Sequence, residues 1–371
     1  MVYDTRTKLF FVLGANDPEM QAIEHLLRTC HQEFRYMKNG VNRVTTEEAY
    51  YSTNNIDIGL SAGLPTSDQA WTIVFIECGG YHAAKKATLQ YIGGLFHIDH
   101  HQPTDPGYGR PPEDFMLASS LGQAISLLAR FGCLDDIYYL SSDWDWSPAD
   151  NRWQLGRIWR TAYSDITDIS WYVDIGSHNN KFHARIPREL VMTAAADHCL
   201  LAAYKNKCPG VSRSELIQHR VKRLANKSRS GYDFLFQEVN KQRERVHRPP
   251  AILTPGGERF VRCNICPQSA CETYSEYGTH AGQTFRFDTD ATANVADFTN
   301  ENMTPYLKEA ACIEGVPCIF TIHNRNRVRK VSLVGASPTV VKNFMSGGYI
   351  SGLHSYYGDP LRGFAGGYVG D

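Results

Sequence analysis

The sequence predicts an α/β protein with a parallel sheet in its N-terminal domain, a helical linker and a smaller α/β domain at its C-terminal end. Two observations favour this fold class. Continuous apolar runs alternate with amphipathic segments in the N-terminal third of the chain, as expected for parallel strands that helices cover on both faces. The 371 residues, 42% of them hydrophobic, are also sufficient for two hydrophobic cores.

Three apolar runs predict the strands of the N-terminal sheet. They are "KLFFVLGA" (Lys8–Ala15), "WTIVFIEC" (Trp71–Cys78) and "GGLFHID" (Gly93–Asp99). Continuous runs of this kind are typical of strands that are buried on both faces. Because strands alternate with helical segments along the chain, we expect the strands to be parallel.

Three further segments predict helices. "DPEMQAIEHLLRTC" (Asp17–Cys30) is amphipathic, with Asp17 in position to cap the helix and Pro18 in its first turn. "MLASSLGQAISLLARFG" (Met116–Gly132) predicts a second helix that ends at its glycine. "PRELVMTAAADHCLLAAYKN" (Pro187–Asn206) predicts a third, which is apolar around one polar pair.

The remaining chain indicates a linker and a second domain. The segment from Arg213 to Arg248 is expected to form one or two helices, and it contains many more basic than acidic residues. The stretch "RPPAILTPGG" then marks a boundary by its proline and glycine content. Strand-like runs follow in "CIFTIHN" and "RKVSLVGA". We therefore predict a domain at residues 1–210, a basic helical linker at 211–250 and a C-terminal substrate-binding domain at 251–371.

Composition and charge exclude several classes of protein. The formal net charge is -1, so no global charge draws the chain to nucleic acid or to an anionic membrane. No apolar run approaches the roughly 20 residues that span a bilayer, and the first apolar run leads into a polar turn rather than a cleavage site. The 10 cysteines lack the spacing of a disulfide scaffold. We expect a cytoplasmic protein with reduced thiols and no membrane partner.

Acidic and histidine side chains follow each of the three predicted strands. The first strand leads into "GANDPE", the second ends in "ECGG" and the third in "DHHQ". Because ligands of α/β proteins bind outside the carboxyl ends of the parallel strands, we expect these side chains to converge at one edge of the sheet. They are Asp17, Glu19, Glu77, Asp99, His100 and His101.

This mixture of carboxylates and imidazoles predicts a site for divalent metal ions. A single acid at a strand end more often caps a helix or faces solvent, so the prediction depends on the conjunction at three strand ends. Imidazole ligands favour Mn²⁺, Zn²⁺ or Fe²⁺ over Mg²⁺ alone. Several acids around two histidines can hold a pair of ions roughly 3.5–4 Å apart, an arrangement that activates a water and clamps a phosphate.

The motif "HIDHHQP" resembles the signature of the DHH phosphoesterase superfamily, and neighbouring motifs follow in the order of that family. "DPE" (Asp17–Glu19) resembles the D-x-D turn after the first strand, and Glu77 resembles the acid that ends a later strand. "TAAADHCL" resembles the fourth motif of the family, which makes Asp197 the matching position, with His198 beside it. The resemblance covers the N-terminal part of the chain well and the C-terminal part loosely.

Three features depart from the family pattern. Glu19 and Glu77 stand where aspartate is usual, and the histidine that opens the first motif in many members has no counterpart near Asp17. The spacing to the fourth motif is longer than usual, so "LSSDWDWSPADNRW" is interpreted as an insertion. Asp143 or Asp145 of that segment is the alternative to Asp197 as the fourth-motif ligand.

The family commonly ends in a glycine-rich motif with a histidine that holds the substrate phosphate. This chain ends in "SYYGDPLRGFAGGYVGD", which lacks that histidine. Glycines allow backbone N–H groups to approach a phosphate, and arginine supplies a bidentate charge. The residues predicted to bind substrate here are Arg362, Gly363, Gly366 and Gly367. A glycine-rich tail without a ligand is the alternative interpretation.

A separate cysteine cluster, "CNICPQSAC", contains Cys263, Cys266 and Cys271. A C-x-x-C pair resembles half of a zinc site, and His280 is the obvious fourth ligand. No second pair follows at the usual spacing, so buried thiols are the preferred interpretation.

The resemblance implies a metal-dependent phosphohydrolase that acts on a phosphoester or phosphodiester through a water activated by two metal ions. It implies Mn²⁺ as the cofactor, with Mg²⁺ as the alternative, and a nucleotide, a short oligonucleotide or a small phosphorylated metabolite as the partner. The implied metal ligands are Asp17, Glu19, Glu77, Asp99, His100 and Asp197. Asp99, His100 and His101 are the implied catalytic residues, with His101 placed to orient the phosphate.

Two other functions fit the same sequence. The departures from the metal motifs also fit a protein that binds a nucleotide or a partner without hydrolysis. The basic segment Arg213–Arg248 favours an exonuclease that works from single-strand ends, whose binding would weaken steeply with salt. The sequence leaves the oligomeric state open, and a homodimer is compatible with it.

Overall fold

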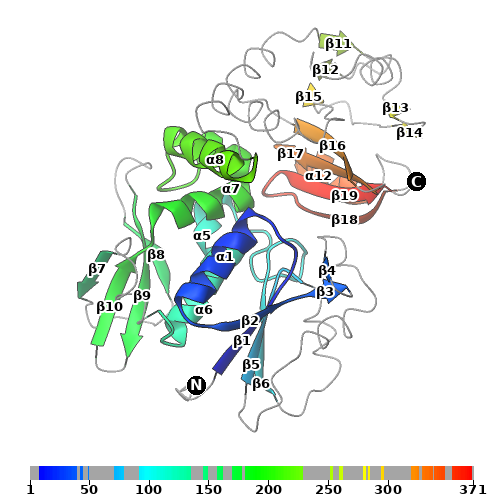
Figure 1. Cartoon of the computed structure of the whole chain (residues 1–371). Helices are drawn as coiled ribbons and strands as arrows, with labels where there is room; N and C mark the ends of the chain where they lie inside the picture. The colour runs from blue at the N-terminus through cyan, green and yellow to red at the C-terminus, as the bar shows by residue number, and fades with distance from the viewer. Residues whose placement is uncertain are drawn as a thin grey trace. The chain divides into compact units, whose positions relative to one another are not determined.

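The structure is a computed structural model, and it describes most of the N-terminal half of the chain and separate parts of the remainder (Figure 1). The described residues are 8–39, 42–44, 49, 71–78, 92–134, 145–148, 157–161, 169–177, 180–228, 251–253, 259–261, 279–280, 283–284, 294–295, 319–325, 328–336, 338–346 and 353–369. The chain forms two compact units. The first comprises Met1–His198 with Cys208–Val211, and the second comprises Cys199–Lys207 with Ser212–Asp371.

The first unit contains a four-stranded parallel sheet. Its strands are β1 (Lys8–Leu13), β2 (Glu33–Tyr36), β5 (Trp71–Ile76) and β6 (Ile92–Ile98), and their order is β2-β1-β5-β6. Every neighbouring pair is parallel. The α/β class and the three strands expected from apolar runs are therefore confirmed. The fourth strand, β2, has only exposed and half-buried side chains, so its sequence lacks the apolar run that would predict it.

The strands β1 and β5 form the centre of this sheet and supply much of its core. All six residues of β5 are buried, and five of the six residues of β1 are buried. The rings of Phe10 and Trp71 meet edge to face with their centroids 6.1 Å apart, a favoured aromatic geometry. Burial on both faces explains why these strands read as continuous apolar runs.

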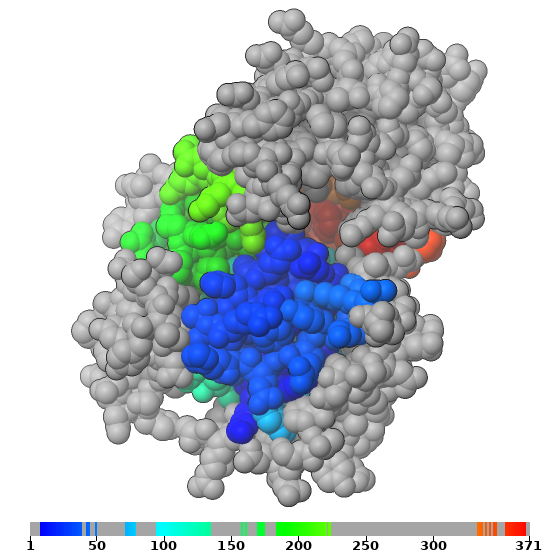
Figure 2. Space-filling view, viewed as in Figure 1, coloured from blue at the N-terminus to red at the C-terminus, as the bar shows by residue number. Residues whose placement is uncertain are grey.

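Helix α1 (Pro18–Thr29) begins as the sequence predicts. Asp17 caps it, with Oδ1 accepting the backbone N–H of Met20 at 2.7 Å, and Pro18 occupies the first helical position. Met20, Ile23 and Leu27 are fully buried on one side of the helix. The segment that contains α1 and β2, drawn in blue, forms a continuous part of the surface in Figure 2, so the polar side of the helix lies outward.

The second predicted helix is interrupted. Residues Phe115–Ala118 form the short helix α5, and Ser120–Arg130 form α6. Ser119 lies between them with extended backbone, and its Oγ accepts the N–H of Gly122 at 3.1 Å. Serine is a favoured N-cap because its hydroxyl satisfies one of the N–H groups at the start of a helix. The predicted helix at 116–132 thus begins later than expected, at the capped turn of α6, and Gly132 follows its end with a φ of 70°.

The order of the parallel sheet places its switch point between β1 and β5. The chain moves from β1 to β2 on one side and then returns to place β5 on the other side of β1. The N–H of Gly14 donates to the carbonyl of Ile76 at 3.0 Å, and a Cβ atom at Gly14 would lie 2.2 Å from the carbonyl oxygen of Glu77. Because Gly14 has no Cβ atom, the ends of β1 and β5 can lie in direct contact. This is the position where α/β sheets bind ligands.

A second sheet of the first unit lies in a region where the sequence predicted no element. Its strands are β7 (Asp145–Pro148), β8 (Ile158–Arg160), β9 (Trp171–Ser177) and β10 (Asn180–Arg185), in the antiparallel order β7-β10-β9-β8. Strand β9 contacts α6. The indole N–H of Trp171 donates to the carbonyl of Pro209 at 2.8 Å, so the returning segment Cys208–Val211 belongs to this unit.

The predicted helix at 187–206 is present as α7 (Arg188–Tyr204). Its backbone leaves the helical conformation at Cys199, where φ is -150°. The first unit ends one residue earlier, at His198. Helix α7 therefore supplies side chains up to His198 to the first unit.

The described part of the second unit contains one long helix and a five-stranded sheet. The helix α8 (Arg213–Ser228) lies within the segment predicted to be helical. The sheet has the order β15-β16-β17-β19-β18, and α12 contacts β18 and β19. Its elements are β15 (Asn294–Val295), β16 (Ile319–Arg325), β17 (Val328–Val334), α12 (Pro338–Met345), β18 (Leu353–Asp359) and β19 (Phe364–Val369). The predicted domain limits at 210 and 250 stay a prediction.

Short elements complete the described chain. They are β3 (Lys38–Asn39), β4 (Asn42–Arg43), the 3₁₀ helix η1 (Pro112–Asp114), β11 (Ala251–Leu253), β12 (Arg259–Val261), β13 (Thr279–His280) and β14 (Gln283–Thr284). Cys263, Cys266 and Cys271 lie outside the described residues. Within the described ranges, no helix combines the length and apolarity that crossing a bilayer requires.

Candidate metal centre

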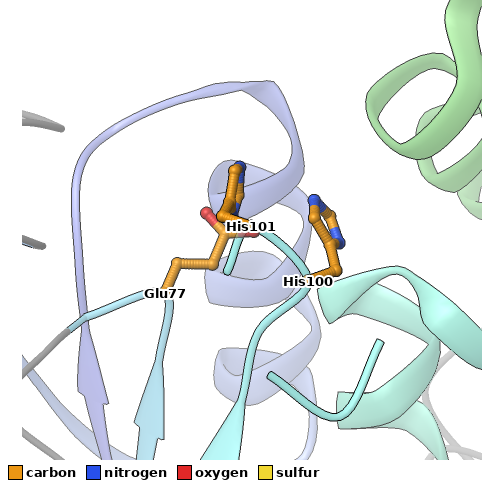
Figure 3. A group of neighbouring side chains, drawn as sticks. All are labelled: Glu77, His100 and His101. Carbon is orange, nitrogen blue, oxygen red and sulfur yellow. The ribbon is translucent and has the colours of Figure 1, made fainter. Parts of the chain in front are cut away.

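Four of the residues predicted to bind metal lie together in the first unit. Glu19 comes from α1, Glu77 from the end of β5, His100 from the turn after β6 and Asp197 from α7. Each offers a ligand atom, and these four atoms lie within 4.8 Å of one another. We call these residues the Glu19–Asp197 group. The ligand atoms of Glu77, His100 and His101 form an overlapping group, in which the carboxylate of Glu77 points towards both rings (Figure 3).

Glu77 is held in a backbone conformation that glutamate rarely adopts. Its φ is 49°, in the left-handed region, and its N–H donates to the carbonyl of Ile98 at 2.9 Å. This conformation costs roughly 1–2 kcal/mol for a residue with a Cβ atom. Its side chain is 3% exposed, and Oε1 accepts no hydrogen bond from the described residues. A strained residue with a buried, unsatisfied carboxylate oxygen indicates a functional position.

Glu19 is fully buried, and its carboxylate accepts a backbone hydrogen bond from the first turn of a helix. Its Oε1 accepts the N–H of Leu121, in the first turn of α6, at 2.9 Å. Exposed N–H groups and the helix dipole make such a position favourable for a carboxylate. Its other oxygen, Oε2, accepts no hydrogen bond within the described chain. Burial, and then the nearby carboxylates of Asp197 and Glu77, raises the pKa of Glu19 well above its ordinary value.

The pKa of Glu77 is also raised well above its ordinary value. Burial is the largest cause, and the negative charges of Asp17, Asp197 and Asp99 act in the same direction. Two buried carboxylic acids with raised pKa values therefore lie in one group. Such groups are stable in ionised form only with compensating positive charge, which a bound cation supplies.

Asp197 lies against His100, with 3.1 Å between Oδ2 and Nε2. Burial opposes the ionisation of Asp197, but the hydrogen bond with His100 and its charge hold the pKa of Asp197 below its ordinary range. Asp197, the preferred candidate for the fourth motif, therefore lies beside His100. Asp143 lies outside the described residues, and Asp145 begins strand β7 of the other sheet.

The carboxylate of Asp99 lies in a separate group with two residues that the sequence did not single out. The possible ligand atoms of His97, Asp99 and Asp105 lie within 4.8 Å of one another. Asp99 Oδ1 accepts the N–H of His100 at 2.6 Å and lies 2.8 Å from Nδ1 of His101. The role of Asp99 as a direct metal ligand stays a prediction, and what the structure gives it is an orienting contact with His101.

Asp17 caps α1 and belongs to none of these groups. Because its Oδ1 accepts the N–H of Met20, we expect Asp17→Ala to lower the free energy of unfolding by about 1 kcal/mol. Asp17→Asn retains the acceptor oxygen and should leave stability nearly unchanged. Urea unfolding of both variants without metal measures this difference. Equal stability of the alanine and asparagine variants would contradict the capping role. A loss of metal affinity in Asp17→Asn, with its stability unchanged, would indicate a ligand role.

Sequence reasoning assigned no role to four residues around the site. His97 precedes Asp99 by two positions on β6, so strand alternation places both on one side. Asp105 lies in the loop after the DHH triplet, and His198 meets His100 edge to face at 5.2 Å between ring centroids. Arg43 donates from Nε to the carbonyl of Gly14 at 2.8 Å. Of the four, only His97 had a usable signal in the sequence, namely its spacing from Asp99.

The predicted substrate-binding residues lie in the second unit, in and after the turn between β18 and β19. Gly363 has a φ of 65° in this turn, and the guanidinium of Arg362 lies over the ring of Phe364 at 5.4 Å. Gly366 lies in β19 between two paired strands, and a Cβ atom there would lie 2.8 Å from the ring of Tyr357. At Gly367 a Cβ atom would lie 2.7 Å from the side chain of Leu353. Close packing thus accounts for the last two glycines, while phosphate binding by this turn stays a prediction.

The buried clusters of glutamate, aspartate and histidine in the first unit can hold metal ions. Oxygen and imidazole ligands together suit Mn²⁺, Zn²⁺ and Fe²⁺. No protein-family model matches the chain, and no curated protein matches it. The resemblance to DHH phosphoesterases therefore depends on the motif residues alone.

Proposed function

We propose that this protein is a metal-dependent phosphohydrolase that acts on a phosphoester or phosphodiester. The observation that carries the proposal is the Glu19–Asp197 group, which gathers three acids and a histidine at the switch point of a parallel sheet. Neutral apolar cores do not collect buried acids with raised pKa values unless a cation or a proton compensates them. The order of the motifs along the chain, which resembles that of DHH phosphoesterases, supports the same function.

The donor set fits a pair of divalent ions, for which we propose Mn²⁺. Glu77 and His100 belong to both overlapping groups of possible ligands, while His101, the third member of the smaller group, is assigned to the phosphate and not to an ion. A carboxylate has two oxygens, so a shared glutamate suits neighbouring ions. When bound, such ions lower the pKa of a water molecule and neutralise phosphate charge.

His101 is placed to contact the phosphate in this proposal. Burial alone lowers the pKa of His101, but the hydrogen bond and charge of Asp99 raise the pKa to about 9. The imidazole is therefore protonated at neutral pH. With Nδ1 held by Asp99, its Nε2–H is the group that can donate a hydrogen bond or a proton to a phosphate oxygen.

The direct test of the proposal is metal content together with hydrolysis. The protein would be stripped with a chelator, titrated with Mn²⁺ and with Mg²⁺ by calorimetry, and assayed with a phosphodiester and a phosphomonoester reporter. We expect two Mn²⁺ ions per chain and hydrolysis that depends on them. A chain that binds no divalent ion would contradict the proposal. One that binds Mn²⁺ but hydrolyses neither reporter nor any nucleotide would support a binding protein without hydrolysis instead.

Binding of Mn²⁺ should depend steeply on pH. Metal binding requires ionised carboxylates, and the raised pKa values of Glu19 and Glu77 mean that protons must leave first. We therefore expect the affinity for Mn²⁺ to rise with pH above the ordinary glutamate value of 4.5. Calorimetry in buffers of different ionisation enthalpy measures the protons released on binding. Zero proton release at all pH values would contradict the assigned ligands.

A nuclease is the second candidate, and helix α8 is the observation that favours it. This helix carries Arg213, Arg220, Lys222 and Arg223 against one acid in its first turn, Glu215. Basic side chains along a helix bind nucleic-acid phosphates with a strong salt dependence. Fluorescence anisotropy with a labelled single strand at two salt concentrations tests this candidate. Binding that does not weaken with salt would exclude it.

A further inference from the structure

The chain after β6 folds back on itself to form a closed loop, which we call the Asp99–Tyr108 loop. The carbonyl of Asp99 accepts two hydrogen bonds, from the N–H of Gly107 at 2.9 Å and from Nε2 of Gln123 at 3.0 Å. The N–H of Asp105 donates to the carbonyl of Gln102 at 2.9 Å. The loop is therefore tied at both ends and in its middle, and His100 and His101 lie within it.

The carboxylate of Asp105 fixes the backbone of this loop. Its Oδ2 accepts the N–H of His101 at 2.8 Å and the N–H of Gln102 at 2.6 Å. The residue is 7% exposed. One oxygen thus holds two consecutive N–H groups, one of which belongs to His101.

Asp99 fixes the side chain of the same histidine. Its Oδ1 accepts the N–H of His100 at 2.6 Å and lies 2.8 Å from Nδ1 of His101. When both the backbone and Nδ1 of a histidine are held, the direction of its Nε2 follows. The imidazole of His101 then lies beside the carboxylate of Glu77 (Figure 3).

His97 lies between the two aspartates. Its Nε2 is 3.5 Å from Oδ2 of Asp99, and its Nδ1 is 3.9 Å from Oδ1 of Asp105. The two ring nitrogens therefore face two buried carboxylates, whose charges repel each other. These three residues could instead hold a metal ion. However, Asp99 Oδ1 and Asp105 Oδ2 already accept N–H groups, which favours a hydrogen-bonded network.

We propose that Asp105 and His97 are positioning residues that orient the imidazole of His101 through Asp99 and the loop backbone. The contact of His101 with a phosphate rests on the proposed function. The orientation of its ring in the metal-free protein does not, and this allows the two ideas to fail separately. His97 opens the motif "HIDHHQP" and Asp105 follows it, but the resemblance assigns a role to neither residue.

The test compares Asp105→Asn with Asp105→Ala in metal-free protein labelled with ¹⁵N-histidine. His101→Gln assigns the His101 signals, and Asp114→Ala is the matched control, because Asp114 lies at the end of η1 with an exposed fraction of 36%. Asparagine keeps an acceptor oxygen for both N–H groups. We expect wild type, Asp114→Ala and Asp105→Asn to retain a hydrogen-bonded Nδ1 proton on His101, while Asp105→Ala exchanges that proton at least tenfold faster.

Hydrolysis and metal affinity provide the second readout. We expect Asp105→Ala to lower kcat with the reporter tenfold or more, in the range seen for residues that orient ligands, while the Kd for Mn²⁺ changes less than threefold. His97→Gln should also lower kcat. If Asp105→Ala does not fold, Asp105→Ser takes its place, and its Nδ1 proton should exchange faster than that of Asp105→Asn.

Two results would overturn the positioning role. One is the same exchange rate and kcat in the alanine or serine variant and in Asp105→Asn. The other is broadening of the His97 signals by a Mn²⁺ ion that Asp105→Asn no longer binds, which would mark a metal site in place of the network. A wild-type protein that retains the hydrogen-bonded Nδ1 proton of His101 but does not bind Mn²⁺ would contradict the proposed function. It would not contradict the positioning role.

Discussion

We expect Glu77→Gln to lower the proposed metal-dependent hydrolysis by about 10³-fold or more, and to weaken Mn²⁺ binding strongly, while the protein remains folded. Glu77 belongs to both overlapping groups of possible ligands, so its loss removes a donor from each. Stabilisation by metal ions amounts to several kcal/mol in related chemistry, and every 1.36 kcal/mol is a factor of ten in rate. Glutamine keeps the size of the side chain but not its charge. Calorimetry with Mn²⁺ and reporter hydrolysis measure the two effects.

Whereas hydrolysis and metal affinity should fall, the stability of metal-free Glu77→Gln should rise above that of wild type. The pKa of Glu77 is raised by burial and by neighbouring acids, so the folded state holds its proton more tightly than the unfolded state does. Stability of the metal-free protein therefore falls as pH rises from the ordinary value of 4.5 through the raised pKa. Glu77→Gln removes this part of the decline, and it should unfold at higher urea than wild type at neutral pH.

Glu24→Gln is the control for this prediction, because Glu24 lies on α1 and pairs with Arg28 at the surface. We expect its metal affinity and hydrolysis to match those of wild type. Wild-type Mn²⁺ affinity in Glu77→Gln would show that this carboxylate is not a ligand. If metal-free Glu77→Gln were less stable than wild type at neutral pH, the buried charge of Glu77 would not be destabilising.

Gly107→Ala is expected to have a large effect on stability. A Cβ atom at this position would lie 2.0 Å from the carbonyl oxygen of Ala118 and 2.8 Å from Cβ of His100. Backbone cannot yield as a flexible side chain does, so we expect a loss of roughly 2–4 kcal/mol in the free energy of unfolding. The displaced loop should also move His100 and lower hydrolysis. Urea unfolding and the reporter assay measure these effects.

Gly109→Ala is the matched control, because it adds the same Cβ atom just after the loop without close contacts. A Cβ atom there would meet nothing within 4 Å, but the φ of 71° makes alanine strained. Its cost should therefore be about 1 kcal/mol, with hydrolysis retained. If the two alanine variants lost the same stability, close packing against Ala118 would not add the expected cost at Gly107.

The sequence predicted those parts of the fold that depend on local pattern. Strands β1, β5 and β6 are apolar because they are covered on both faces, and Asp17 with Pro18 marks the start of α1. Strand β2 escaped prediction because it lies at the edge of the sheet with polar side chains. The interruption at Ser119 depends on where the first turn of α6 meets Glu19, a contact between segments far apart in the chain.

The site was predictable where its residues sit at strand ends. Parallel pairing of β1, β5 and β6 carries Glu19, Glu77 and His100 to one edge, as the sequence predicts. Placing Asp197 required the resemblance, because no local pattern relates it to His100. The roles of Asp99 and Asp105 were not predictable, since the direction in which a carboxylate points within a loop depends on tertiary hydrogen bonds.

The position of Asp197 in α7 has a consequence for the order of events during synthesis. Asp197 follows His100 by roughly a hundred residues, which a ribosome adds in about 5–20 s. A nascent chain that has emerged only as far as the end of α6 has the parallel sheet, Glu19, Glu77 and His100, but not the carboxylate that faces His100. The first unit also needs the later segment Cys208–Val211, whose Pro209 accepts the indole N–H of Trp171. Binding of the proposed metal ions is therefore expected to follow the docking of α7, late in the folding of this unit.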